Sequence, residues 1–200
     1  PLTHPTTMPR SPRHAAHQGF TIVELLVTIA IIALLSLAAV PFARDIIIAG
    51  KVEPTASDIN KVATRIRGNF AGQGSTPYAN LGAGAAATAV FANTARSMAS
   101  SLVVTGTSAG ATVQHEIGAT GAQVTVAQAQ VTLPGDSFAV TLPTVNAAAC
   151  PALAAQLSRA AERITINNTL VKQVGGVFNG GTAQNACTPD DTNTFVFQFR

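Results

Sequence analysis

One stretch near the start of the chain is apolar without interruption. From Phe20 to Val40 the sequence holds 21 residues with a single charge, Glu24. A helix of this length spans about 32 Å at 1.5 Å per residue, which matches the roughly 30 Å hydrocarbon core of a bilayer. The pattern therefore predicts a helix that can cross a membrane.

The hydrophobic pattern changes after this stretch. Pro41 and Gly50 are weak points at which a helix can kink or loosen without ending. Apolar residues then recur every three or four positions, at Ile59, Val62, Ile66 and Phe70. This spacing predicts an amphipathic helix whose apolar stripe packs on a folded domain. We expect one long jointed helix from Phe20 to about Phe70, apolar in its first half and amphipathic in its second.

The rest of the chain has shorter elements. Residues 78–110 resemble a linker rich in Ala, Gly, Asn and Thr, with a short helix predicted at 86–98. From residue 112 the period is two, and strands are predicted around 124–126, 131–133 and 138–142, with a turn at Pro134-Gly135-Asp136. A helix is predicted at 147–162, with Cys150 in its first turn, and a hairpin at 164–174.

The last segment places Phe195, Phe197 and Phe199 on one face, as a half-buried strand requires. Together these elements predict an α+β fold. In it a small antiparallel sheet rests on the amphipathic half of the long helix.

Charge changes this picture little. The formal net charge is +3, but Arg10 and Arg13 lie in the first 19 residues, which contain no acid. These two positive charges ahead of the apolar run favour a cytoplasmic amino end. The remaining charges nearly balance and are scattered singly, which argues against a general nucleic-acid surface.

The two cysteines, Cys150 and Cys187, follow the membrane-targeting segment. If the domain after that segment lies in an oxidising compartment, an even number of cysteines indicates a disulfide. Two separate buried thiols remain the alternative. Zinc is disfavoured because neither cysteine has a second ligand at short spacing.

No catalytic, metal or cofactor site emerges from the residues. His115 and Glu116 point to opposite faces of a strand, which suits solvated side chains better than a dyad. The glycines from Gly175 to Gly181 suit a turn between strands, and Asn167-Asn-Thr169 matches a glycosylation acceptor at chance level. Asp190 and Asp191 are expected to be solvated. Glu24 differs, because a charge in hydrocarbon costs about 2.5 kcal/mol or more and therefore indicates a function.

The string Gly19-Phe20-Thr21-Ile22-Val23-Glu24-Leu25-Leu26 resembles the class III signal of type IV pilins and pseudopilins. The resemblance implies that a prepilin peptidase cuts between Gly19 and Phe20 and methylates the new amino group. It also implies that Glu24 pairs with the amine of Phe20 on a neighbouring subunit.

A second resemblance covers residues 51–200. A long leader, a late cysteine pair, the segment 174–181 and a closing Phe-rich strand are similar to type IVb major pilins, including those of conjugative thin pili. In that family the cysteine pair holds the outer region of the head, which implies this role for Cys150 and Cys187.

These resemblances imply a structural subunit and no enzyme: a major pilin precursor for an extracellular filament used in adhesion, aggregation or conjugation. We expect a cytoplasmic leader at 1–19, a membrane and filament-core helix at 20–53, and a head at 54–200. The implied partners are identical subunits, prepilin peptidase, the pilus assembly machinery and, before assembly, the bacterial inner membrane.

Other interpretations explain less of the sequence. A plain membrane anchor leaves Glu24 and the Gly-Phe junction unexplained. A secretory signal cut near Ser36-Leu-Ala38 would have an unusually long apolar run. A pseudopilin of a type II secretion system, or a minor or DNA-uptake pilin, remains the alternative within the family. No clustered acidic loop favours the pseudopilin, and no basic stripe favours the DNA-uptake pilin.

Overall fold

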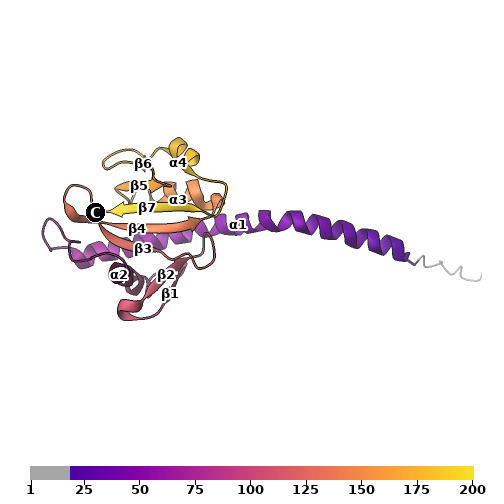
Figure 1. Cartoon of the computed structure of the whole chain (residues 1–200), viewed down its shortest axis with the longest axis horizontal. Coiled ribbons are helices and arrows are strands. Elements are labelled where there is room, and N and C mark those ends of the chain that lie inside the picture. Colours follow the sequence, from indigo (N-terminus) through magenta and orange to yellow (C-terminus); the bar gives the residue numbers. More distant parts are fainter. Residues whose placement is uncertain (1–18) are drawn as a thin grey trace, which may run out of the picture. The chain divides into compact units, whose positions relative to one another are not determined.

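The computed structural model describes residues 19–200 (Figure 1). Their contacts divide the chain into two compact units that meet between Val40 and Pro41. The basic residues Arg10 and Arg13, on which the cytoplasmic leader was predicted, lie outside the described residues. The domain boundaries predicted at 19 and 53 stay predictions.

The predicted long helix is confirmed as α1, Ile22–Phe70. It begins where the Thr21 hydroxyl accepts a hydrogen bond from the backbone N–H of Glu24, at 3.2 Å, as an N-cap residue does. It ends before Gly72, whose φ of 92° is open to glycine but costly for other residues.

The head unit, from Pro41 onward, adds three further helices and seven strands to the second part of α1. The helices are α2 (Ala85–Ala95), α3 (Cys150–Leu157) and α4 (Gly180–Ala186), with short 3₁₀ turns at Ser108–Gly110 and Ala147–Ala149. The strands are β1 (Leu102–Thr105), β2 (Thr112–His115), β3 (Thr125–Gln130), β4 (Pro134–Val145), β5 (Arg163–Ile166), β6 (Thr169–Lys172) and β7 (Asn193–Phe199).

The strands form two antiparallel sheets. β1 and β2 make a two-stranded hairpin, and the others make a five-stranded sheet in the order β3-β4-β7-β5-β6. The predicted α+β class and the β5-β6 hairpin are confirmed. β7 lies between β4 and β5, pairing Phe197 with Val140 on one side and with Ile164 on the other.

The core lies between α1 and the large sheet (Figure 1). Ile59, Val62 and Ile66 of the predicted apolar stripe are fully buried, as are the three phenylalanines of β7. Aromatic rings continue this packing from the end of α1 to the sheet. Phe70 contacts Tyr78, Tyr78 contacts Phe138, and Phe138 contacts Phe199, with centroids 4.9 to 5.6 Å apart. Burial of this apolar surface is the main term that stabilises the head.

The interpretation of residues 78–110 as a linker is wrong, but the short helix predicted within them at 86–98 is confirmed as α2. This region contains α2 and β1, and it buries Tyr78, Leu81 and Phe91. Alanines form the packed face of α2, where Ala87, Ala92 and Ala95 are fully buried. Small side chains let this helix approach its neighbours closely.

The strand expected at 131–133 is also absent, because those residues form the turn between β3 and β4. The buried carboxylate of Asp136 accepts hydrogen bonds from the backbone N–H groups of Val131, Thr132 and Leu133, at 2.8 to 3.0 Å. Burial by itself raises the pKa of this carboxyl. The three N–H donors and nearby Arg200 outweigh that effect and lower the pKa to about 2, from its usual 3.8.

Asp136 should therefore contribute about 2 kcal/mol to the free energy of unfolding at neutral pH. Since its folded pKa is depressed, this contribution is complete above pH 3.8 and is lost as the pH falls toward 2. We expect Asp136→Asn to lower the urea midpoint of the detergent-solubilised protein at pH 7 and to reduce its dependence on pH between 4 and 2. Exposed Asp190→Asn is the control. An unchanged acid dependence in Asp136→Asn would contradict the assignment.

The disulfide between Cys150 and Cys187 is confirmed, with Cα atoms 6.0 Å apart. It joins the first residue of α3 to the residue that follows α4.

Helix α3 ends at Leu157, five residues before the predicted end, and α4 replaces part of the turn expected at Gly175–Gly181. The Asn179 side chain caps α4 by accepting from the N–H of Thr182 at 2.9 Å. Cap and disulfide thus hold a helix whose Gly-rich start has low intrinsic propensity.

Replacing both cysteines with serine should lower the free energy of unfolding by about 3 to 4 kcal/mol, because the bridge closes a loop across 37 residues. Urea unfolding of the oxidised protein and of the double variant measures the difference. Reductant should destabilise the wild type by a similar amount and leave the double variant unchanged. Equal stability of the oxidised wild type and the variant would show that the bridge adds nothing.

Candidate functional site

The most unusual surface in the described chain is the apolar one on the first part of α1. Sixteen large hydrophobic side chains between Phe20 and Ile47 are at least half exposed, from 51% for Ile31 to 81% for Phe20. Among the described residues, α1 is the one helix long and apolar enough to cross a membrane. A soluble monomer rarely exposes so large an apolar patch, so this surface has to be covered by lipid or by another protein.

The predicted residues Gly19, Phe20 and Glu24 lie together at the start of this surface. With Thr21 they line a hollow of about 570 Å³. The Glu24 side chain is exposed, and its carboxylate makes no hydrogen bond or ion pair within residues 19–200. A carboxylate in the first turn of a helix is favoured by the helix dipole, yet it still needs a cation if the surrounding surface becomes buried.

Sequence reasoning did not single out Thr21. Thr21 and Glu24 have the Ser/Thr-x-x-Glu spacing of a capping box, and the structure supplies one of its two hydrogen bonds, from the N–H of Glu24 to the Thr21 hydroxyl. The spacing was therefore an available signal. It assigns Thr21 to the start of the helix and Glu24 to its third position.

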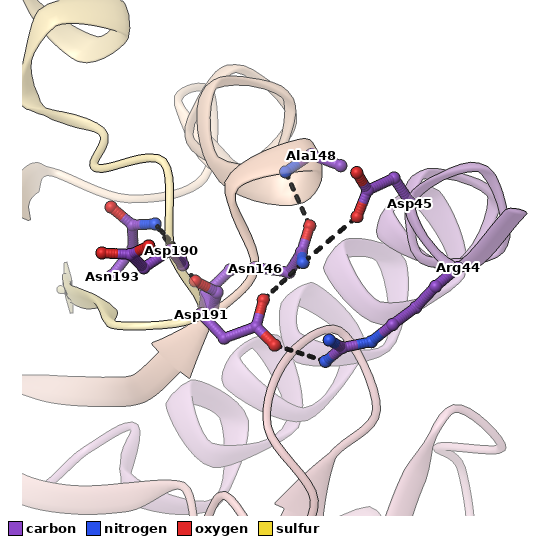
Figure 2. A network of polar contacts seen from close by, with 8 residues as sticks. Arg44, Asp45, Asn146, Ala148, Asp190, Asp191 and Asn193 are labelled. Carbon is purple, nitrogen blue, oxygen red and sulfur yellow. Dashed lines mark hydrogen bonds and ion pairs between the residues drawn. The ribbon is translucent and has the colours of Figure 1, made fainter. Parts of the chain in front are cut away.

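A second group of polar residues lies at the start of the head unit (Figure 2). The Asn146 amide donates to Asp45, at 3.4 Å, and also to Asp191. Arg44 forms an ion pair with Asp191. The Asn146 oxygen accepts from the N–H of Ala148 at 2.7 Å. This network joins one turn of α1 to the end of β4 and to the loop between α4 and β7.

The same loop is fixed from its other side by buried Asn193. Its side-chain nitrogen lies 3.1 Å from each of the backbone oxygens of Val145, Thr188 and Asp190, which share its two N–H donors. The expectation that Asp190 and Asp191 are both simply solvated is therefore wrong for Asp191. No sequence signal could have shown this, because Arg44 and Asp191 are 147 positions apart.

His115 also differs from expectation. Its side chain is buried, not solvated, and its Nε2 donates to the carbonyl oxygen of Pro143 at 2.8 Å. Burial lowers the pKa of His115, and the hydrogen bond to Pro143 raises it by less. Glu116 instead forms an exposed ion pair with Lys51 at 2.9 Å. These contacts tie the β1-β2 hairpin to its neighbours and give no acid–base pair.

The asparagine of the glycosylation triplet, Asn167, is also engaged in hydrogen bonds within the head. Asn167 donates to Asn193 and to the carbonyl of Ala186, both at 2.9 Å, and accepts from the N–H of Thr194. Its amide is thus part of the internal bonding of the head. Residues 19–200 contain no cluster of three or more His, Cys, Asp or Glu side chains that could hold a metal ion.

Comparison with known families explains these features. Residues 15–40 match the model of the prokaryotic N-terminal methylation motif, and residues 50–199 match the model described as PilS N terminal. The chain belongs to the PilS family of type IV pilins. Together the two matches cover the exposed apolar helix and almost the whole head, so this protein is a pilus subunit.

Solved pilin structures share the fold. The crystal structure of a type IVb pilin from Salmonella typhi aligns with a TM-score of 0.56 and 24% identity, over 73% of this chain and 97% of that one. TcpA, a type IV pilin from Vibrio cholerae El Tor, aligns with a TM-score of 0.51 and 15% identity, over 76% and 99%. Among curated proteins, none matches the chain significantly. The predicted likeness to type IVb pilins is confirmed.

Asn146→Ala should lower the free energy of unfolding of this pilin by about 1 to 3 kcal/mol, because Asp45 and Asp191 would lose the amide that lies between them. Thermal or urea unfolding in detergent measures the loss. Asn69→Ala is the matched control, since Asn69 is exposed on α1. If both variants are equally stable, the network does not hold the loop to α1.

Proposed function

We propose that this pilin is the major subunit of a type IV pilus, cut after Gly19 and polymerised through the apolar surface of α1. The observation that carries the proposal is the exposure of sixteen large hydrophobic side chains between Phe20 and Ile47. Left in water, each such side chain would cost about 1.5 to 3 kcal/mol relative to its burial, so this surface has to stay covered both in the membrane and after the subunit leaves it. Transfer of this surface from lipid into a bundle of identical helices would give the filament an apolar core.

The start of α1 supports cleavage at this junction. A cut between Gly19 and Phe20 leaves Thr21, the N-cap, in the mature chain. The helix would therefore keep its first stabilising contact after the leader is removed. The new amino group on Phe20 would also lie four residues before Glu24.

Glu24 is proposed to set the register of assembly. Its exposed carboxylate would be buried when α1 enters the bundle, and burial of an unpaired charge is strongly unfavourable. The amino group of Phe20 on a neighbouring subunit is the cation that the proposal supplies. Subunits in another register would leave both charges unpaired.

The same proposal places the precursor in the inner membrane, with prepilin peptidase and the pilus assembly machinery as its partners. The length and apolar character of α1 support insertion into a bilayer before assembly. The mature protein would then move from the membrane to the extracellular filament.

Glu24→Ala should be cleaved and inserted normally but should lower the yield of sheared filaments by about tenfold or more, as loss of one pair worth about 1.4 kcal/mol predicts. Mass spectrometry of the membrane fraction should find Phe20 as the methylated first residue in the wild type and in the variant. Glu162→Ala, which removes a carboxylate from the head, is the control.

Two results would oppose the proposal. A normal filament yield from Glu24→Ala would exclude a register role for this carboxylate. A mature chain that begins at another residue, such as Ala39, would exclude cleavage of the pilin type.

A further inference from the structure

The head unit leaves one face of α1 uncovered. At about 100° per residue, the exposed positions after Ile48 fall on one side of the helix, whereas Val52, Ile59 and Ile66 fall on the buried side. This uncovered face is apolar at its start, where Ile46 and Ile47 are about 60% exposed, and polar farther on. It includes Ile46, Ile47, Gly50, Glu53, Ser57, Lys61, Arg65 and Gly68.

Acidic and basic side chains lie at different positions along this face. Glu53 lies in its first half, and Lys61 and Arg65 lie near its end. Lys61 contacts buried Asp58 at 2.8 Å, but Glu53 and Arg65 make no hydrogen bond or ion pair within the described residues. A groove of about 680 Å³ opens beside the two basic residues, with Met98 among its lining and no carboxylate.

We propose that a second copy of this chain packs on the uncovered face, with Glu53 of one copy paired to Arg65 of the next. The inference rests on the proposed function, because it extends the subunit interface from the apolar part of α1 into the head. Two observations favour a second copy: the uncovered face continues directly from the exposed apolar residues Ile46 and Ile47, and it has a negative charge in its first half and positive charges near its end.

The positions of the two charges suit a repeating contact. Glu53 and Arg65 are twelve residues apart, which corresponds to about 18 Å along α1 and about 120° around it. They therefore lie on different flanks of the uncovered face. Parallel copies displaced by about 18 Å would bring Glu53 of one beside Arg65 of another, while each copy keeps its second flank free for a further neighbour. Such a heterologous contact does not close on itself and can continue along a filament.

An anionic polymer or lipid headgroup is a different occupant for the basic groove. It would gain from Lys61 and Arg65 but would be repelled by Glu53 on the same face. The charge pattern therefore favours a partner that presents both signs, as a second copy does.

A charge-swap series in the cells that produce the pilus tests the pairing. Glu53→Arg and Arg65→Glu should each lower the yield of sheared filaments at least tenfold, and the double variant E53R/R65E should restore the yield to within about twofold of the wild type. Arg159→Glu, the same charge change at an exposed site outside α1, is the matched control. Full-length membrane protein with an intact disulfide on a non-reducing gel verifies folding.

Each outcome decides the inference. It is overturned if both single variants assemble normally, if the double variant fails to recover, or if only Arg65→Glu has an effect, which would indicate an anionic partner. If a charge reversal prevents folding, Glu53→Gln and Arg65→Gln replace it, and each should then lower the yield alone, with no larger loss when combined. Absence of filaments from the wild type would instead overturn the proposed function itself, and this inference with it.

Discussion

Helix α1 is one continuous helix with two different surroundings: the sheet of the head covers its second part, and the described chain leaves its first part uncovered. Where the five-stranded sheet covers it, the helix is amphipathic, and its buried face includes Ile59, Val62 and Ile66. Where the described chain provides no cover, before Val40, the helix is apolar all round. This division of one helix by what lies against it accounts for both the fold of the head and the apolar surface that the head leaves exposed.

The head holds its stretch of α1 at both ends. At the start, Arg44 pairs with Asp191, and Asp45 accepts from Asn146. Near the end, Arg67 donates to the carbonyl of Ala160 at 2.9 Å and lies over the ring of Phe199, 5.6 Å from its centroid. Between these points, apolar packing supplies most of the stability, while the polar contacts fix the position of the helix along the sheet. Because α1 cannot slide along the sheet, a force applied to α1 at an interface between copies acts on the whole head.

The elements that could be predicted from the sequence are those whose cause is local. A continuous apolar run, a stripe at helical spacing and alternating phenylalanines each specify their own surroundings, so α1 and β7 were predictable. The elements that could not be predicted depend on distant partners. Asp191 pairs with Arg44, 147 positions away, and α4 depends on the bridge from Cys187 to Cys150. The turn at Val131–Leu133 depends on a nearby residue, but its cause is the burial of the Asp136 carboxylate, which the sequence does not show. At the candidate site, Gly19, Phe20 and Glu24 were recognisable from their spacing. The charges on the uncovered face of α1 were not, because only the packing of the head shows which charged side chains are exposed and unpaired.

The strand order also has a consequence for the timing of folding. β7 follows every other strand in the chain, yet it occupies the middle of the large sheet, between β4 and β5. Until it is in place, β3-β4 and β5-β6 are two separate hairpins, each of marginal stability. These long-range pairings require closure of large loops, which slows folding. The head therefore completes its core only after β7 has been synthesised. Because α1 comes first in the chain, it can enter the membrane before that point. This order would keep an incomplete head from presenting a finished surface to other subunits.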